Sequence, residues 1–448
     1  MSELVANHRL RAVMSQAGVS HKGLARRVDD LGAAAGLDLR YGHTAVARWL
    51  AGRVPRPPVP TLIADALGAK LGHPISPADI GMAPSGAENA GFVYSRGLGQ
   101  AVDAARTYWS TVDRRTFAVA LPCAAVFLRP LARWVSNPRE EDAGHRGGPR
   151  IGMADVERLR VQAEAARHLD SAIGGLTPSA MVDRCLATEA APLLGGTYTD
   201  AVGRELFTAV SVLTRLSAWS AFDTGVQREA QARFVQALRY AQAAGDVQFG
   251  AYTLASAAFQ AVYLGDAETA IDLAQGASAI ARHSATPRVL AFVRIAEARG
   301  HARAGDRPAT EAALSAAEGL LERADAERDE DPPYIDFLDH SRMQADAAEA
   351  YLALGVPARV IALTDSATHI RPGFTRSHGL RLSVLAAAHA SAGEAEGACS
   401  YGREAVTTAR HVNSSRLDAY LRHFGKRLGP LRAAPGVPEL LAALPRAQ

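Results

Sequence analysis

Apolar positions recur every three or four residues between positions 7 and 71, which is the period of α-helices with one buried face. Residues 7–17 place Leu10 and Met14 on one side, and Gly18 ends the pattern. Turn residues then separate three further short helices, predicted at residues 20–28, 44–50 and 62–71. We therefore predict a compact helical domain over residues 1–82.

Beyond residue 152, helix is predicted to follow helix, and glycines mark the turns. Five of them recur at spacings of 40, 40, 50 and 38 residues: Gly225, Gly265, Gly305, Gly355 and Gly393. An alanine stands seven residues before each glycine, and another stands twelve residues after it. Small side chains at such points let antiparallel helices pack closely. We therefore predict stacked helical hairpins over residues 151–432, beginning in degenerate form near residues 156–169, and a tail over 433–448.

The segment between these two regions, residues 83–150, is interrupted by glycine and proline. We interpret it as a linker with connecting helices and expect a mobile, charged loop near residues 136–149. Composition agrees with this plan, because alanine dominates the chain and clusters of β-branched residues are scarce. An all-α protein of at least two domains is therefore expected from the 448 residues, with almost no sheet.

Charge is distributed unevenly along the chain. Residues 1–82 contain ten lysines and arginines against six aspartates and glutamates, a net charge of +4, whereas the whole chain carries +3. A basic head on a nearly neutral body indicates that the head binds a polyanion.

The three cysteines, Cys123, Cys185 and Cys399, lie far apart and show no metal-ligand spacing. We expect a reducing cytoplasm, no structural metal and no cofactor. The first residues, MSELVANHRLRAV, lack the apolar core of a signal peptide, so secretion is not expected.

One stretch, DRRTFAVALPCAAVFL at residues 113–128, imitates a twin-arginine signal. Pro122, Arg129 and Pro130 interrupt its apolar run before it is long enough to cross a bilayer. We interpret the stretch as a buried or interface helix and expect no membrane association. Its apolar helices, around residues 117–134, are one candidate surface for self-association.

The head contains two successive helical phrases, SHKGLARRV and HTAVARWLAG. The second places Val46, Trp49 and Gly52 where a recognition helix has its apolar residues and its terminal glycine, and the basic exit GRVPRPP follows. This pattern resembles the DNA-binding domain of the lambda-repressor/Cro-like helix-turn-helix family, although the connection between the two helices is longer than usual in that family. The resemblance implies binding to a double-stranded DNA operator.

When positions are counted back from Gly52, the resemblance implies that His43, Thr44 and Arg48 face the bases. Cations around the second helix and after the recognition helix are expected to bind backbone phosphates: Lys22, Arg26, Arg27, Arg53 and Arg56. The alternative interpretation is a small helical bundle in which Arg48 is merely solvated. Trp49 belongs to the core in both interpretations.

The hairpin pattern resembles tetratricopeptide repeats, most clearly in YLGDAETAIDLAQGASAIA at residues 263–281. The sequence AERDEDPPY, residues 326–334, looks like a loop inserted into the stack. Such a superhelix has a concave face lined by the first helix of each hairpin, which suits an unknown peptide, protein or small-molecule effector. Residues four before each turn glycine, including His301, Tyr351 and His389, are candidates for that face; equally, they pack only between repeats.

The order of the parts narrows the resemblance. With the segments DRRTF, RIGMADVERLR and APLLGGTYTDAVGRELF between head and repeats, the chain is similar to helix-turn-helix regulators with tetratricopeptide-like C-terminal halves, found in high-GC filamentous bacteria. Some members of that family repress differentiation and secondary metabolism. The resemblance implies a sequence-specific transcriptional regulator and repressor, associated with the nucleoid in the cytoplasm. We also expect a homodimer, held together by the C-terminal body, because one head reads only one half-site.

Two other classes of function were weighed. The first is a cytoplasmic scaffold whose repeats bind peptides or proteins without specific DNA recognition. The second is an enzyme that uses Asp336, Asp339 and His340 in YIDFLDHSR. Helical repeats commonly present such residues as solvated polar faces, and the sequence has no HExxH motif or phosphate-binding glycine loop. We therefore expect no catalysis.

Overall fold

The structure is a computed structural model that describes residues 6–34, 39–55, 59–71, 75, 77, 79–82, 90–111, 120–139, 143–173, 176–327, 331–363, 370 and 373–445. Throughout these ranges the regular elements are helices, and pairing outside them is limited to two isolated bridges, His145 with Tyr198 and Arg150 with Thr197. The predicted all-α fold is confirmed. Two compact units divide the chain: Met1–Gly91 with Asp103–Val119, and Phe92–Val102 with Ala120–Gln448.

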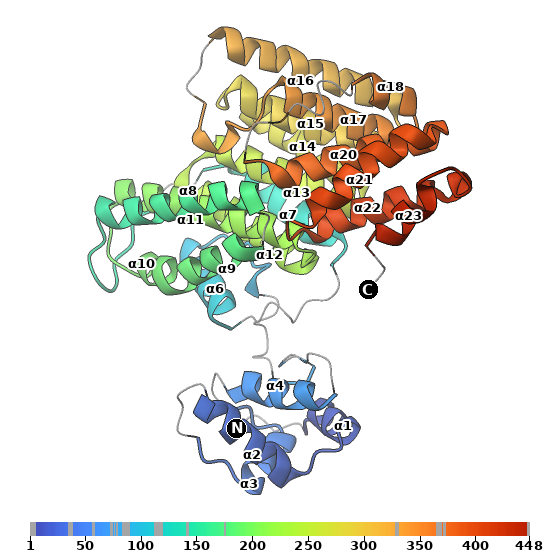
Figure 1. The fold of residues 1–448 in the computed structure, drawn as a ribbon. Helices are drawn as coiled ribbons and strands as arrows, with labels where there is room; N and C mark the ends of the chain where they lie inside the picture. Colours follow the sequence, from blue (N-terminus) through green and yellow to red (C-terminus); the bar gives the residue numbers. More distant parts are fainter. Residues whose placement is uncertain are drawn as a thin grey trace. The chain divides into compact units, whose positions relative to one another are not determined.

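The described residues 6–71 of the first unit contain four short helices that match the predicted order (Figure 1): α1 (His8–Gln16), α2 (His21–Ala34), α3 (His43–Leu50) and α4 (Val59–Leu71). Hydrogen bonds from side chains fix two of the helix starts. Asn7 Oδ1 accepts from the backbone N–H of Leu10 at 3.0 Å, and Ser20 Oγ accepts from that of Gly23 at 3.2 Å. The apolar faces then meet in one core: Leu10, Leu24, Val28, Val46, Ile63 and Leu67.

The second unit is a solenoid of helical hairpins, preceded in the chain by α6 (Leu98–Thr111) and α7 (Cys123–Ser136). Its successive pairs are α8 (Met153–Ile173) with α9 (Leu176–Cys185), α11 (Asp200–Asp223) with α12 (Gln227–Ala244), α13 (Val247–Leu264) with α14 (Ala267–Ala281), α15 (Pro287–Ala304) with α16 (Arg307–Glu327), α17 (His340–Ala353) with α18 (Pro357–Ala362), and α20 (Thr375–Ala392) with α21 (Ala395–Ala409). Short helical segments lie between some of them: the π-helix Leu186–Ala190, the helix α10 (Ala191–Leu194), and the 3-10 helices Pro333–Ile335 and Gly429–Leu431. The terminal helices are α22 (Ser415–Arg427) and α23 (Val437–Ala443).

The five predicted turn glycines each lie between the two helices of a hairpin. All five have left-handed backbone conformations, with φ between 71° and 88°, which glycine adopts without the strain that a side chain causes. The paired alanines before and after them are buried at every described position; the remaining one, Ala367, lies outside the described residues. The sequence pattern therefore identified the true hairpin contacts.

Helix α7 contains most of the candidate association surface around residues 117–134, of which 117–119 lie outside the described residues. Its apolar side packs on α12 and α14 within the second unit. Trp134 is fully buried against Gly250, and Leu131 packs against Gly276. Both glycines lack a side chain where these large residues approach, so the apolar stretch completes the core of the solenoid.

The second half of the charged loop expected near residues 136–149 is described and makes long-range backbone contacts. Backbone N–H and C=O groups of His145 bond to those of Tyr198 at 3.1 and 3.0 Å, and Thr197 N–H donates to Pro149 C=O at 2.8 Å. Asp200 accepts from Ala143 N–H at 2.7 Å. These long-range bonds fasten residues 143–150 to the turn before α11, which the local composition does not reveal.

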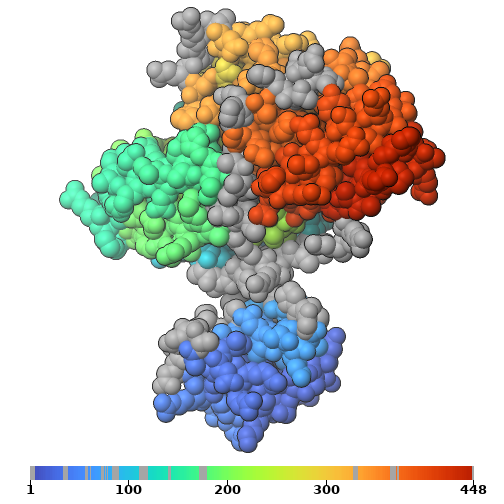
Figure 2. Space-filling model, viewed as in Figure 1, coloured from blue at the N-terminus to red at the C-terminus, as the bar shows by residue number. Residues whose placement is uncertain are grey.

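The predicted tail likewise contains structure, because α23 packs on α21 and buries Val437 and Leu440. In the space-filling view, the C-terminal helices form a continuous surface, shown in red (Figure 2). A final helix of this kind covers the apolar end of a helical stack. Among the described helices, none is long and apolar enough to cross a membrane.

Candidate nucleic-acid interface and enclosed cavity

Helix α3 has one buried and one exposed face. Val46, Trp49 and Leu50 point into the core of the first unit, and the ring of Tyr41 meets Trp49 edge-on at 5.2 Å. The exposed positions are His43, Thr44, Ala47 and Arg48. These four follow the helical repeat, so the three predicted base-reading side chains share one solvent-facing surface.

The end of α3 fixes where the chain leaves that surface. Gly52 has a φ of 97°, its N–H donates to Trp49 C=O at 3.0 Å, and Arg53 N–H donates to Arg48 C=O at 3.0 Å. This is the hydrogen-bond pattern of a Schellman cap. It holds the exposed Arg53 directly after the helix. Arg56, the other predicted phosphate contact here, lies outside the described residues.

The three cationic side chains of α2 differ in how accessible they are to a binding partner. Lys22 and Arg26 are exposed, and Arg26 forms only a solvated contact of 4.0 Å with Asp30. Arg27 is half-buried and donates to the C=O of Gly23 at 3.3 Å, so it is partly held against its own helix. Lys22 and Arg26 are therefore the freer cations for an anionic partner.

The connection between α2 and α3 is longer than in the helix-turn-helix pattern, yet its end is fastened to α2. The backbone N–H of Tyr41 donates to both carboxylate oxygens of Asp29 at 3.0 Å. Gly42 then begins α3 without a side-chain cap, and the first turn of α3 contains no acidic residue. The helix start thus keeps a positive partial charge, which favours an approaching anion.

The second unit contains a cavity of about 880 Å³. Its walls come mainly from the first helix of successive hairpins, α11, α13, α15, α17 and α20, together with α8, α22 and the loop over residues 332–337. The volume lies within the range typical of small-molecule sites. The inserted loop predicted at residues 326–334 therefore supplies part of the cavity wall.

The residues that line the cavity occupy equivalent positions in successive hairpins. The residue thirteen before each turn glycine lines the cavity in all five hairpins: Val212, Tyr252, Phe292, Arg342 and Leu380. The residue six before the glycine lines it in four: Trp219, Phe259, Arg299 and Glu349. The two positions are seven residues apart and so lie on one side of a helix. Large aromatic and charged side chains recur at these two positions, and this pattern in the sequence could have indicated the cavity wall.

The residues predicted for the effector face lie elsewhere: none of His301, Tyr351 and His389 lines the cavity. His389 stacks on Tyr401 at 5.3 Å, and Arg359 covers the ring of Tyr351 at 5.4 Å. His301 lies 3.8 Å from Glu297 of its own helix. These positions are two residues beyond the true lining positions, which corresponds to a rotation of about 200° around the helix. The first helices of the hairpins supply much of the cavity wall, and the three candidate residues lie on another side of these helices.

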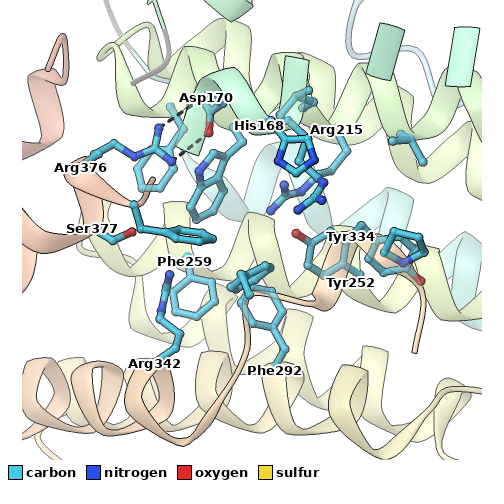
Figure 3. A pocket seen from close by; sticks show the side chains of 18 of the residues that line it. His168, Asp170, Arg215, Tyr252, Phe259, Phe292, Tyr334, Arg342, Arg376 and Ser377 are labelled. Atoms are coloured by element: carbon cyan, nitrogen blue, oxygen red, sulfur yellow. Dashed lines mark hydrogen bonds and ion pairs between the residues drawn. The ribbon is translucent and has the colours of Figure 1, made fainter. Parts of the chain in front are cut away.

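Buried ion pairs close the solenoid around the cavity (Figure 3). Arg376 of α20 donates to both carboxylate oxygens of Asp170 in α8, at 3.1 and 2.9 Å. It also lies 3.3 Å from Asp223 at the end of α11, and Asp223 lies 3.3 Å from Arg416 of α22. Burial opposes the charge on Arg376, yet the two carboxylates raise its pKa overall. Helices from the two ends of the array are thereby joined.

Aromatic rings form one wall of the cavity. Tyr334 of the inserted loop stacks on Tyr252 at 4.8 Å and meets Phe249 edge-on at 4.9 Å. Phe292 packs between Tyr252, at 5.2 Å, and Phe337, at 5.7 Å. Because each ring contacts at least one other, this wall is largely preorganised for a flat apolar ligand.

The residues considered for catalysis do not converge. Asp336 pairs with Arg167 at 3.0 Å, Asp339 caps α17 through the N–H of Arg342, and His340 lies 3.3 Å from Asp325. Each of these contacts holds a helix or the inserted loop in place. Among the described residues, no cluster of three or more His, Cys, Asp or Glu side chains is arranged to hold a metal ion.

Comparison with protein families gives a match for the N-terminal part of the chain. The SP15 N-terminal domain family matches residues 10–83, which are essentially the helices α1 to α4. No curated protein matches the chain. The match covers less than half of the chain and therefore describes the first unit alone.

Proposed function

We propose that this protein is a sequence-specific, DNA-binding transcriptional regulator. The observation that carries the proposal is the two-sided helix α3. Its buried residues fix its orientation in the first unit, and its outer face presents His43, Thr44 and Arg48 together. A helix of this kind fits the major groove, where an arginine can donate two hydrogen bonds to guanine O6 and N7.

The cations around this face support the same proposal. Arg53 follows the helix end, Lys22 and Arg26 project from α2, and the start of α3 carries no acidic residue. Such groups bind phosphates on both sides of the groove and set the position of the reading helix without sequence preference. Arg48 then supplies the largest single contribution to base discrimination.

The second unit is assigned the regulatory part of this function. Its cavity is large enough for a small effector, and none of its lining residues belongs to the helices α1 to α4. We further propose that the protein acts as a homodimer through this unit, because a single recognition helix reads one half-site and two linked helices gain effective concentration. We also propose that the protein acts in the cytoplasm at the nucleoid, where it represses genes of differentiation or secondary metabolism.

The decisive experiment compares Arg48→Ala with the wild-type full-length protein on DNA fragments selected from genomic DNA. We expect Arg48→Ala to weaken binding to the selected operator by about 1–3 kcal/mol and to relax the preference at one base pair, with helix content unchanged. Arg11→Ala removes the same charge from the exposed side of α1 and should keep the base preference.

Three results would contradict parts of this proposal. Equal weakening on all DNA sequences would make Arg48 a phosphate contact. Failure of the wild-type protein to select any DNA sequence, combined with capture of peptides, would favour the scaffold alternative. A concentration-independent monomer in analytical ultracentrifugation of the full chain would exclude a dimer in the absence of DNA.

A further inference from the structure

The cavity of the second unit contains a cation whose surroundings differ from those of its neighbours. Six lining arginines pair with carboxylates: Arg160, Arg167, Arg299, Arg342, Arg376 and Arg416. Two other lining arginines bond to serine hydroxyls: Arg381 donates to Ser341 at 2.9 Å, and Arg215 donates from Nε and Nη2 to Ser256 at 3.2 and 2.9 Å. In the part of the chain that the structure describes, no carboxylate forms an ion pair with Arg215.

Aromatic rings hold this guanidinium in place. Its Cζ atom lies 4.3 Å from the ring centre of Tyr252 and 4.9 Å from that of Trp219. Figure 3 shows Arg215 reaching from α11 toward the side of the cavity where Tyr252 and Tyr334 lie. A guanidinium has five N–H donors; Ser256 takes two and Tyr252 also accepts a hydrogen bond, so donors remain for a ligand. Burial lowers the pKa of Arg215, which is the expected effect of removing a cation from water without a full counter-charge.

The chemistry of the surroundings defines what would fit. Phe249, Phe259 and Phe292 provide apolar surface on the same wall, and Tyr334 covers it from the inserted loop. A flat apolar body can stack there without losing hydrogen bonds. An anionic group on that body can take the remaining donors of Arg215, and charge-assisted bonds of this type are the strong ones.

We propose that the cavity binds a small organic anion with an aromatic or otherwise flat apolar body, whose carboxylate, sulfonate or phosphate group is held by Arg215. The inference rests on the proposed role of the second unit as a sensor and gives that sensor a ligand class. Arg215 confers the preference for an anion, and the aromatic wall confers the preference for a flat apolar body.

Two fluorescent probes test the proposal on the full-length protein without DNA. The first is 1-anilinonaphthalene-8-sulfonate, and the second is N-phenyl-1-naphthylamine, which has the same rings without the sulfonate. We expect one sulfonate probe per chain, bound at least about ten times more tightly than the neutral one, since a hydrogen bond to a charged group is worth a factor of about ten or more.

Variants then assign the preference to the cavity. Arg215→Met and Arg215→Gln should weaken the sulfonate probe by about ten- to a hundredfold and change the neutral probe by less than about twofold. Arg215→Lys keeps the charge and should retain most of the binding. Ala345→Trp, on the α17 wall, should displace both probes, whereas Arg282→Met at an exposed position should change neither.

The outcomes separate this inference from the proposed function. Equal loss of both probes in Arg215→Met and Arg215→Gln would show that Arg215 only supports packing, and the proposal would be wrong. Equal affinity of the wild-type protein for the two probes, or binding that Ala345→Trp does not alter, would also overturn it. The probe experiments contain no DNA, so their results do not test operator recognition. A failure to bind DNA would likewise not contradict the binding of an anion in the cavity.

Discussion

Removing the charge of Arg376 should open the contact that joins the two ends of the solenoid. In Arg376→Met the side chain keeps a similar length, but Asp170 loses both of its bonds to the guanidinium, at 3.1 and 2.9 Å. Among the described residues, the hydrogen bond that Asp170 then keeps comes from Ser220 Oγ, at 3.3 Å. Asp223 is less affected, because Ser414 still donates to it at 2.9 Å and Arg416 lies 3.3 Å away.

The size of the effect follows from burial. The side chains of Arg376, Asp170 and Asp223 are 7%, 6% and 0% exposed, so solvent screens their interactions very little. Breaking a buried pair by removing one partner costs about 3–5 kcal/mol, since the other charge stays buried. At about 2 °C per kcal/mol for a large unit, Arg376→Met should lower the melting temperature of the second unit by about 6–10 °C.

Far-UV circular dichroism of the full chain measures this transition, because most of the helices belong to the second unit. The double variant Asp170→Asn, Arg376→Met removes the stranded charge and should recover at least about 2 kcal/mol of the loss. Arg282→Met, at an exposed position, is the control and should melt like the wild type. Additive losses in the double variant, or an unchanged melting temperature in Arg376→Met, would refute the argument.

Three further predictions follow from single positions. Arg53→Ala should reduce the slope of log K against log salt by about one unit on any DNA sequence, as measured by fluorescence anisotropy; an unchanged slope would place Arg53 away from phosphate. Gly305→Ala should destabilise the protein by about 1–2 kcal/mol because its φ is 80°, whereas Gly319→Ala, inside α16 with open space around it, should be neutral or stabilising by up to about 1 kcal/mol. Burial raises the pKa of Cys123 to about 11 and that of Cys185 to about 12, so both thiols should resist alkylation at pH 8 until the protein unfolds; rapid labelling of the native protein would contradict their burial.

Local patterns were sufficient to predict the helices and their turns. The period of apolar residues placed α1 to α4 in order, and the glycines at 225, 265, 305, 355 and 393 all proved to be left-handed turns between paired helices. These features depend on residues a few positions apart, whose steric and hydrogen-bonding preferences act within one or two helical turns. The exposed side of α3 was predictable for the same reason.

Features that depend on packing between distant segments were not predictable. Asp170 and Arg376 are 206 residues apart, and no local signal connects them. The apolar stretch at residues 123–134 could equally have been an outer surface until its contacts with α12 and α14 were known. Its burial depends on Gly250 and Gly276, more than a hundred residues further along the chain.

The sequence by itself determined an all-helical chain with a small basic head, a short helix at residues 44–50 with a defined outer face, and a stack of hairpins with close alanine contacts. Only the tertiary structure decided which side of each first helix faces the cavity, because that depends on how each hairpin rotates on the next one. A displacement of two positions turned His301, Tyr351 and His389 away from the cavity and brought Phe259 and Arg299 to it. The same packing brought Arg215, Tyr252 and Tyr334 together from three separate segments, and no pattern confined to one segment can encode their meeting.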